Sequence, residues 1–339
     1  MSGRTFTQYL LIIMFMTTLL PQAVPPCGAA EAKQVVFVRF NLKDDTPDSV
    51  IVEEFKKTMA ARGYEEGTDI EYIDFVTHNP ERESAGEVLQ LIEEYKDSAD
   101  MFITTSWTSL YVRSKLAKTH VPQLFAPALK STALNMLPSL DKEPDTNLSG
   151  VYLMYPPEKV LRFARLLLPG LKRYAYVYDS RIPADTLLKS AYGVLSDRQR
   201  HGFEVFYLDL AAGTDTAMQQ LRKLKIEAFG GAVGLFKRME HLSRAGLPIV
   251  TSLLFDRGRD AMLEAVKSSN VLAGLYNPFD LCGRQAAEMT ADIFDGRTTI
   301  EKTMPQPARQ LAVINLHAAE RLRISVPVSA LEAADIVIR

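Results

Sequence analysis

Length, composition and charge limit the classes of protein that this chain can represent. Its 339 residues, 47% of them hydrophobic and 24% charged, suit a globular protein with enough chain for two domains of ordinary size. The formal net charge of −2, without a block of Lys and Arg, argues against a nucleic-acid partner, because phosphate binding needs clustered basic side chains.

Residues 1–30 have the layout of a secretory signal peptide. A basic start precedes an uncharged, apolar run at 9–20, and small residues follow a proline-containing stretch. The run is shorter than the roughly twenty apolar residues of a membrane-spanning helix. We therefore expect an exported, periplasmic protein that is cleaved after Ala30 or Ala32. A retained N-terminal anchor and a lipoprotein anchored through Cys27 are the alternatives.

Beyond this leader, short β-branched runs alternate with longer amphipathic ones. The pattern predicts strands at 35–38, 70–75, 101–104 and 123–126, and helices at 49–62, 83–95 and 110–118. Gly63 is expected to end the first of these helices as a C-terminal cap. Strands that alternate with helices imply βαβ crossovers and a parallel sheet with helices on both faces.

The same pattern restarts after Gly150. It predicts helices at 159–168, 186–201 and 214–224, and strands at 173–178, 203–208, 228–233 and 248–252. Two stacks of similar size indicate two lobes with a cleft between them. Ligands of open α/β sheets bind beyond the carboxyl ends of the strands, so the candidate site lies at those ends.

Motifs of enzymes and metalloproteins are missing. The sequence has no phosphate-loop, G-x-G-x-x-G or G-x-S-x-G motif, and its five histidines lack the spacing of zinc ligands. The nearest glycine cluster, 230–234, overlaps a predicted strand and favours a strand end that bends into a loop. Only Cys282 would remain after cleavage, which excludes an intrachain disulfide. We expect no enzyme, no metal and no cofactor.

The segment after the strand at 101–104 is the strongest candidate for ligand contact. Hydroxyl groups at Thr105, Ser106 and Thr108 precede a predicted helix, where free backbone N–H groups can hold a carboxylate or another anion. Simple N-capping is the alternative. Trp107, the only tryptophan, suits stacking on a flat ligand at the cleft edge, with core packing as its alternative.

Further side chains are candidates for contact with a ligand in the same cleft. Those that follow predicted strands are Phe40, Asn41, Asp179, Ser180 and Phe236, and the others are Lys130, Asp256 and Tyr276.

Eight short segments, spread in order over most of the chain, carry a family resemblance. They are 61–67, 147–151, 157–159, 166–169, 174–178, 283–289, 314–320 and 326–327. Together they resemble the solute-binding proteins of ABC transporters, in the group that includes the tryptophan and tyrosine binders. The resemblance implies the α/β type 1 periplasmic-binding fold, with two lobes, a parallel sheet flanked by helices in each, a hinge and a ligand cleft. Lobe 1 is then expected to comprise 31–150 with about 271–300, and lobe 2 151–270 with about 301–339.

The sequence departs from this family where the ligand would lie. The segment 129–131 replaces a common Thr-Asp-Pro, the segment 233–235 replaces a polar Thr-Asp-Asn loop, and Leu253 stands where an Asp is frequent, unless Asp256 takes that role. A buried ammonium group needs an acidic or carbonyl partner. The loss of these acids argues against an α-amino acid ligand.

These features predict an exported, monomeric solute-binding protein that captures an aromatic or otherwise apolar ligand and delivers it to an ABC permease. The anionic end of a carboxylate-bearing ligand would meet Ser106, Thr108 and Lys130. A periplasmic sensor that feeds a receptor kinase is the alternative function, and a secreted α/β enzyme is the third interpretation.

Overall fold

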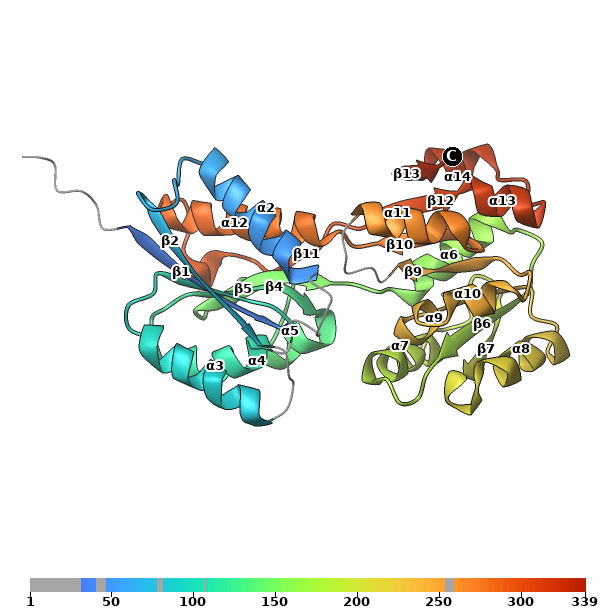
Figure 1. Ribbon diagram of the computed structural model, residues 1–339, viewed down its shortest axis with the longest axis horizontal. Helices are drawn as coiled ribbons and strands as arrows, with labels where there is room; N and C mark the ends of the chain where they lie inside the picture. Colours follow the sequence, from blue (N-terminus) through green and yellow to red (C-terminus); the bar gives the residue numbers. More distant parts are fainter. Residues whose placement is uncertain (1–31, 41–46, 78–81, 107, 254–258) are drawn as a thin grey trace, which may run out of the picture. The chain divides into compact units, whose positions relative to one another are not determined.

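The computed structural model describes residues 32–40, 47–77, 82–106, 108–253 and 259–339, which form two β-sheets flanked by helices (Figure 1). The expected signal peptide and the candidate residues Asn41, Trp107 and Asp256 lie outside these ranges, as does the side chain of Phe40.

The first sheet has six parallel strands in the order β11-β5-β4-β3-β1-β2, and we call it with its helices the six-stranded lobe. Its elements are β1 Lys33–Phe40, α2 Pro47–Ala61, β2 Ile70–Thr77, α3 Arg82–Tyr95, β3 Met101–Thr104, α4 Thr108–Leu116, β4 Gln123–Leu129, α5 Lys130–Met136, β5 Leu148–Leu153, α12 Phe279–Phe294, η2 Ile300–Lys302 and β11 Gln306–Pro307.

The second sheet has seven strands in the order β13-β12-β10-β9-β8-β6-β7 and defines the seven-stranded lobe. Its elements are α6 Pro157–Leu167, β6 Arg173–Tyr178, α7 Pro183–Gly193, β7 Glu204–Asp209, η1 Leu210–Ala212, α8 Thr214–Lys223, β8 Ala228–Gly231, α9 Val233–Phe236, α10 Met239–Ser243, β9 Ile249–Leu253, α11 Arg259–Ser268, β10 Val271–Tyr276, β12 Leu311–Asn315, α13 Leu316–Leu322, α14 Val328–Glu332 and β13 Ile336–Ile338. The pair β10 and β12 is antiparallel, and the other pairs are parallel.

Strand β1 shows why the six-stranded sheet is covered on both faces. Side chains alternate along a strand, and here both faces are apolar. Val35 and Phe37 pack in a cluster with residues of α2 and α12, whereas Val36 and Val38 pack in a cluster with residues of α3 and α4. Figure 1 shows α2 and α12 on one side of the sheet and α3 and α4 on the other. The parallel sheet that the apolar runs predict is confirmed.

The seven-stranded sheet is covered in the same way. Tyr174 and Tyr176 of β6 pack against the apolar stripe of α6, while Ala175 and Val177 face a cluster that includes residues of α8 and α11. Pro157 opens α6 at its first position, where a missing N–H removes no helical hydrogen bond. This helix corresponds to the one predicted at 159–168.

Helix α2 ends at the glycine that the sequence indicates. Gly63 has a φ of +94°, a value that glycine adopts without a Cβ penalty. Its N–H donates to the carbonyl of Ala60, and the N–H of Tyr64 donates to the carbonyl of Met59, both at 3.0 Å. These two bonds satisfy carbonyls that the helix end would leave free. The predicted C-terminal cap is confirmed.

Helix α7 is shorter than the sequence predicts. The expected helix ran to residue 201, but α7 ends at Gly193. Beyond it, the Ser196 hydroxyl accepts the N–H of Gln199, and the Gln199 side chain accepts the N–H of Ser196. This reciprocal pair is a capping box that starts a separate turn, so the amphipathic pattern belongs to two local structures and not to one helix.

The chain passes between the two lobes three times. The crossovers are 154–156 between β5 and α6, 277–278 between β10 and α12, and 308–310 between β11 and β12. The expected boundaries therefore need correction. Strand β10, at 271–276, pairs with β9 in the seven-stranded sheet, and β11 pairs with β5 in the six-stranded one. Sequence periodicity shows that a strand exists but not which sheet accepts it.

Candidate ligand site

An apolar cavity of about 680 Å³ lies between α5 and α7. Its walls come from elements of both lobes and from the first crossover. They include Leu129 and Leu134 from the end of β4 and from α5, Tyr155 and Pro156 from the crossover, and Leu187 and Val194 from α7 and its end. A volume of this size is typical of pockets for small organic ligands.

Several of the apolar side chains in this cavity are exposed. Leu134, Leu187 and Val194 are 46%, 45% and 82% exposed, and they count among the large apolar residues that the described part of the chain leaves open to solvent. Single exposed leucines are ordinary, but exposed apolar residues gathered around a concavity mark a binding surface. None of these three was a sequence candidate, because a leucine on an amphipathic helix carries no signal of what it faces.

Lys130 is the candidate that the structure places in this cavity. It is the first residue of α5, it is exposed, and it lines the cavity beside Leu129 and Ser131. Within the described ranges its ammonium group makes no ion pair. It is also the only charged residue among those that line the cavity in the described structure. A positive charge is therefore available at an otherwise apolar site.

The loop between β3 and α4 uses most of its hydroxyl groups internally. Thr108 is fully buried, and its hydroxyl lies 2.8 Å from the carbonyl oxygen of Val38 and 2.6 Å from that of Thr105. Thr105 is buried as well, and its N–H donates to Val38. Ser106 is exposed, with a φ of 52° in the left-handed region. Of the three predicted hydroxyls, the one of Ser106 alone is open to solvent.

The carboxylate of Asp179, at the carboxyl end of β6, is enclosed by two arginines. It is 2% exposed. Its Oδ1 accepts hydrogen bonds from the backbone N–H and from Nε of Arg181, and its Oδ2 accepts from Nη2 of Arg181 at 2.7 Å and from Nη2 of Arg238 at 2.9 Å. The Arg181 guanidinium, with Arg238, holds the pKa of the Asp179 carboxyl well below its usual range. The exposed Ser180 donates its N–H to Asp209.

A second buried carboxylate, Asp185, accepts hydrogen bonds from two backbone segments at this edge of the sheet. Its Oδ2 accepts the N–H of Asp179 at 2.9 Å and the N–H of Gly234 at 3.0 Å. Burial raises the pKa of the Asp185 carboxyl, although these backbone donors oppose the rise. A Cβ on Gly234 would lie 2.6 Å from Asp185 Oδ2, so the close approach requires glycine. Gly234 lies within the short helix α9, whereas the sequence predicted only a strand end and a loop here.

The remaining candidates do not join this site. Tyr276 is 1% exposed and packs in the core of the seven-stranded lobe, where burial raises the pKa of its hydroxyl above the ordinary value. Phe236 packs against the same core and lines a different cavity. Tyr276 is the last residue of β10 and Phe236 is the last residue of α9, and a side chain at the end of an element can turn into the lobe as readily as out of it.

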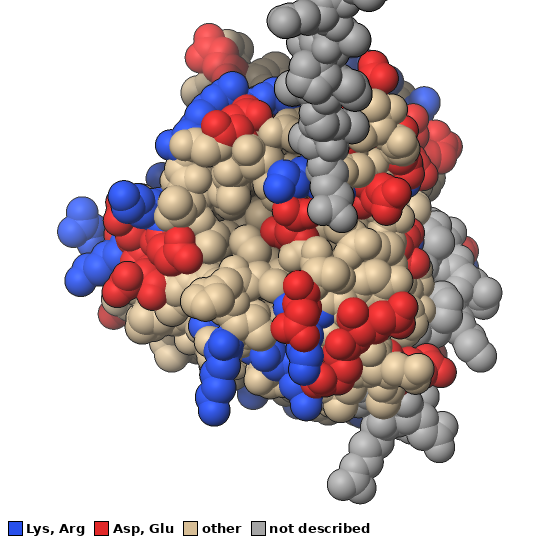
Figure 2. Space-filling model, turned by 90° about the vertical axis from the view of Figure 1, so that its left-hand side faces the viewer, with Lys and Arg blue, Asp and Glu red and all other residues tan. Residues whose placement is uncertain are grey.

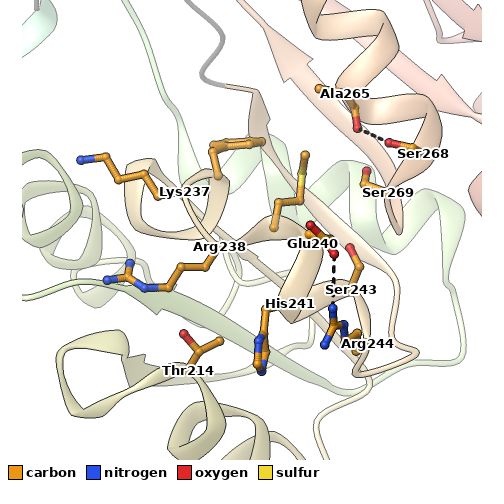
Figure 3. Close-up of a pocket in the computed structure, with 12 residues that line it drawn as sticks. Thr214, Lys237, Arg238, Glu240, His241, Ser243, Arg244, Ala265, Ser268 and Ser269 are labelled. Carbon is orange, nitrogen blue, oxygen red and sulfur yellow. Dashed lines mark hydrogen bonds and ion pairs between the residues drawn. The ribbon is translucent and has the colours of Figure 1, made fainter. Parts of the chain in front are cut away.

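This second cavity, of about 700 Å³, lies within the seven-stranded lobe (Figure 3). Its charged side chains are mostly paired with neighbours. Arg244 donates to Glu240 at 3.2 Å, as Figure 3 shows, and His241 lies 2.8 Å from Asp215. Arg238 is the same residue that encloses Asp179. Because one lobe forms this cavity, a ligand here could not link two lobes.

Acidic and basic side chains are interspersed on the surface. In the view of Figure 2, Lys and Arg side chains lie among Asp and Glu side chains over the six-stranded lobe. Ion pairs at α12 have the same mixed character: Arg284 lies 2.6 Å from Glu54 of α2, and Arg62, the residue after α2, lies 2.8 Å from Asp292. On the described part of this face, the two signs of charge are thus mixed.

The described ranges contain neither a cluster of metal ligands nor a helix that could span a membrane. No group of three His, Cys, Asp or Glu side chains there could hold a metal ion. No helix among the elements given above is long and apolar enough to cross a bilayer.

Comparison with solved structures identifies the fold. A Streptococcus pneumoniae ABC domain in complex with L-Trp is 18% identical, with a TM-score of 0.66 over 91% of this chain and 100% of that one. A ligand-free, open substrate-binding protein with adhesive properties from Clostridium difficile is 16% identical, with a TM-score of 0.72 over 90% and 99% of the two chains. This chain has the type 1 periplasmic-binding fold.

A conserved domain protein from Vibrio cholerae has the same fold, with 19% identity and a TM-score of 0.67 over 91% of this chain and 100% of that one. The expected fold class is thus confirmed. No family model and no curated protein matches the sequence.

Proposed function

We propose that this chain is an exported solute-binding protein that captures a small, largely apolar organic ligand and presents it to an ABC permease. The observation that carries the proposal is the apolar cavity between α5 and α7, whose walls come from two lobes that three crossovers connect. The fold supports it, because similar structures include an ABC domain in complex with L-Trp and an open substrate-binding protein.

A ligand in this cavity can change the equilibrium between open and closed forms. Leu134 and Leu187 belong to different lobes and line the same cavity. A ligand that contacts both favours the form in which they approach each other, since only a difference in affinity between two forms can shift their populations. No bond needs to be made or broken, and we propose no catalytic step.

A first experiment tests the cavity. The mature protein is screened by thermal shift and calorimetry against small aromatic and aliphatic compounds, and we expect ligands to raise Tm and to reduce the radius of gyration in small-angle scattering. At a hundredfold excess over Kd the stabilisation is about 2.7 kcal/mol. Leu187→Glu should weaken binding at least tenfold, because it places a charge on the apolar wall.

The matched control is Val328→Glu. Val328 is 69% exposed and lies on α14, away from the residues that line the cavity. Its substitution should leave both Tm and Kd unchanged. Equal affinity in the two variants would mean that the ligand binds elsewhere, and the proposed site would be wrong.

A second experiment tests export and the partner. The full-length chain, expressed in a Gram-negative host, should be recovered from the periplasm without residues up to Ala30 or Ala32, as intact mass would report. Ligand-loaded protein should stimulate the ATPase activity of its cognate permease in proteoliposomes. Stimulation of a receptor kinase instead would assign the protein to a sensor system.

A further inference from the structure

Among the described residues that line the proposed cavity, the only charge is positive. Lys130 is the single charged residue that lines it in the described part of the chain, and its ammonium group makes no ion pair there. The other polar lining side chains are neutral hydroxyls, of Ser131, Ser190 and Tyr155. A ligand that enters this cavity therefore meets one positive charge in apolar surroundings.

The nearest carboxylates on the neighbouring strand edge are not available to a ligand. Asp179 is 2% exposed, and both of its oxygens already accept hydrogen bonds from Arg181 and Arg238. Asp185 is fully buried and is not among the residues that line the cavity; its Oδ2 accepts two backbone N–H groups, and its Oδ1 is buried without a hydrogen-bond partner in the described structure. Its chain neighbour Ala184 lines the cavity and presents a methyl group there.

This arrangement discriminates between cationic and anionic ligands. A ligand ammonium group would lose water in an apolar cavity, would find no carboxylate among the described residues that line it, and would lie near the like charge of Lys130. A ligand carboxylate would lose water too, but Lys130 can donate a charge-assisted hydrogen bond to it. The hydrogen bonds to water that a ligand loses in the cavity are therefore replaced for a carboxylate and not for an ammonium group.

We propose that the ligands of this site are apolar monocarboxylic acids without an α-amino group, and that Lys130 is the residue that recognises the carboxylate. The arginine-bound Asp179 keeps the site from accepting the matching amino acids. This inference rests on the proposed solute-binding function and specifies its substrate class.

The test uses the mature wild-type chain and four probes of one carbon skeleton: 3-phenylpropanoate, its neutral amide, L-phenylalanine and 3-phenylpropylamine. Octanoate, octanamide and octylamine form an aliphatic series. Calorimetry at constant ionic strength gives each Kd. In at least one series we expect the acid to bind at least tenfold more tightly than the amide, and the amino acid and the amine at least a hundredfold more weakly than the acid.

Variants at one position separate charge recognition from packing. Lys130→Ala should remove the preference for acid over amide while the affinity for the amide stays within twofold. Lys130→Glu should reverse the order of acid and amine. The control is Lys237→Ala, which removes an exposed lysine from the second cavity and should change none of these affinities.

The outcomes separate the two proposals. If the amide binds as tightly as the acid, or if L-phenylalanine binds more tightly than 3-phenylpropanoate, the inferred acid specificity is wrong while solute binding stands. If no probe binds and the thermal-shift screen also finds no ligand that Leu187→Glu weakens, the proposed function fails as well. An acid preference that survives in Lys130→Ala would reject Lys130 as the recognising residue.

Discussion

The side chain of Gln310 donates a hydrogen bond from Nε2 to the backbone carbonyl of Met154 at 2.8 Å, which joins the third crossover to the first. The same carbonyl accepts a longer bond of 3.4 Å from Asn277 in the second crossover, and Asn277 is 2% exposed. The three crossovers thus share one acceptor. Since the lobes can move relative to each other only through these segments, the shared carbonyl lies where hinge motion must be absorbed.

Gln310→Ala should loosen this hinge. The substitution removes the bond between two crossovers, so we expect faster hydrogen exchange at 154–156 and 308–310 and a loss of about 1 kcal/mol in the free energy of unfolding. Gln306→Ala is the control, because Gln306 bonds with Gln285 inside the six-stranded lobe. Unchanged exchange in Gln310→Ala would show that this bond does not restrain the hinge.

Much of the fold could be predicted from the sequence because buried parallel strands leave a strong pattern. The strands at 101–104 and 173–178 were predicted with the bounds that the structure has. Helix α5 was missed, because seven residues directly after a strand show too little periodicity. The sheet to which β10 belongs was also assigned wrongly, since lobe membership depends on contacts between distant segments.

The candidate site was harder to predict for a different reason. Thr108 is at a strand-to-helix junction as expected, but its hydroxyl faces the carbonyl of Val38, seventy positions earlier in the chain. Asp179 is at a strand end as expected, but Arg238 reaches its carboxylate from α10's N-terminal boundary. A sequence shows which polar side chains lie at the end of a strand. It does not show which of them already form hydrogen bonds with residues that are distant in the chain.

Gly234→Ala should destabilise the edge of the seven-stranded lobe. An added Cβ would lie 2.6 Å from Asp185 Oδ2 and 3.0 Å from Asp179 Cβ, so backbone or side chains must shift. We expect a loss of about 1–3 kcal/mol in urea unfolding. Gly86→Ala is the matched control: Gly86 is exposed within α3 with nothing within 4 Å of an added Cβ, and the change should stabilise by about 0.5–1 kcal/mol. Equal effects of the two substitutions would contradict the close approach at Gly234.

Asp179→Asn should destabilise the protein at neutral pH and have less effect in acid. The lowered pKa of Asp179 means that the folded state favours its ionised form. The resulting stability is present above the ordinary aspartate pKa of about 3.9 and is lost as pH falls through the lowered folded pKa. With Arg181 62% exposed, solvent screening reduces the effect, and we expect about 1–3 kcal/mol at pH 7.

The measurement is urea unfolding of wild type and variant at pH 7 and near pH 3, where the difference should narrow. Asp215→Asn serves as the control, because the Asp215 side chain is 85% exposed and should contribute little at either pH. A difference that is equal at both values, or that grows in acid, would contradict the ion-pair account of Asp179.

Trp107 offers a direct readout of ligand binding. Its neighbour Ser106 donates its N–H to the carbonyl of Pro127 at 2.9 Å, which fixes that side of the loop beside β4, and the last residue of β4, Leu129, lines the cavity. We therefore expect a saturating ligand to shift or quench the emission of this single tryptophan. The sequence predicts that the Trp107 indole stacks on the ligand, so Trp107→Ala should weaken binding about tenfold or more, with the stacking itself worth about 0.5–1.5 kcal/mol beyond the area buried on binding. Trp107→Phe, which keeps an aromatic ring, should lose less binding affinity than Trp107→Ala. Emission that stays fixed at saturation, together with normal binding by Trp107→Ala, would place this residue away from the ligand.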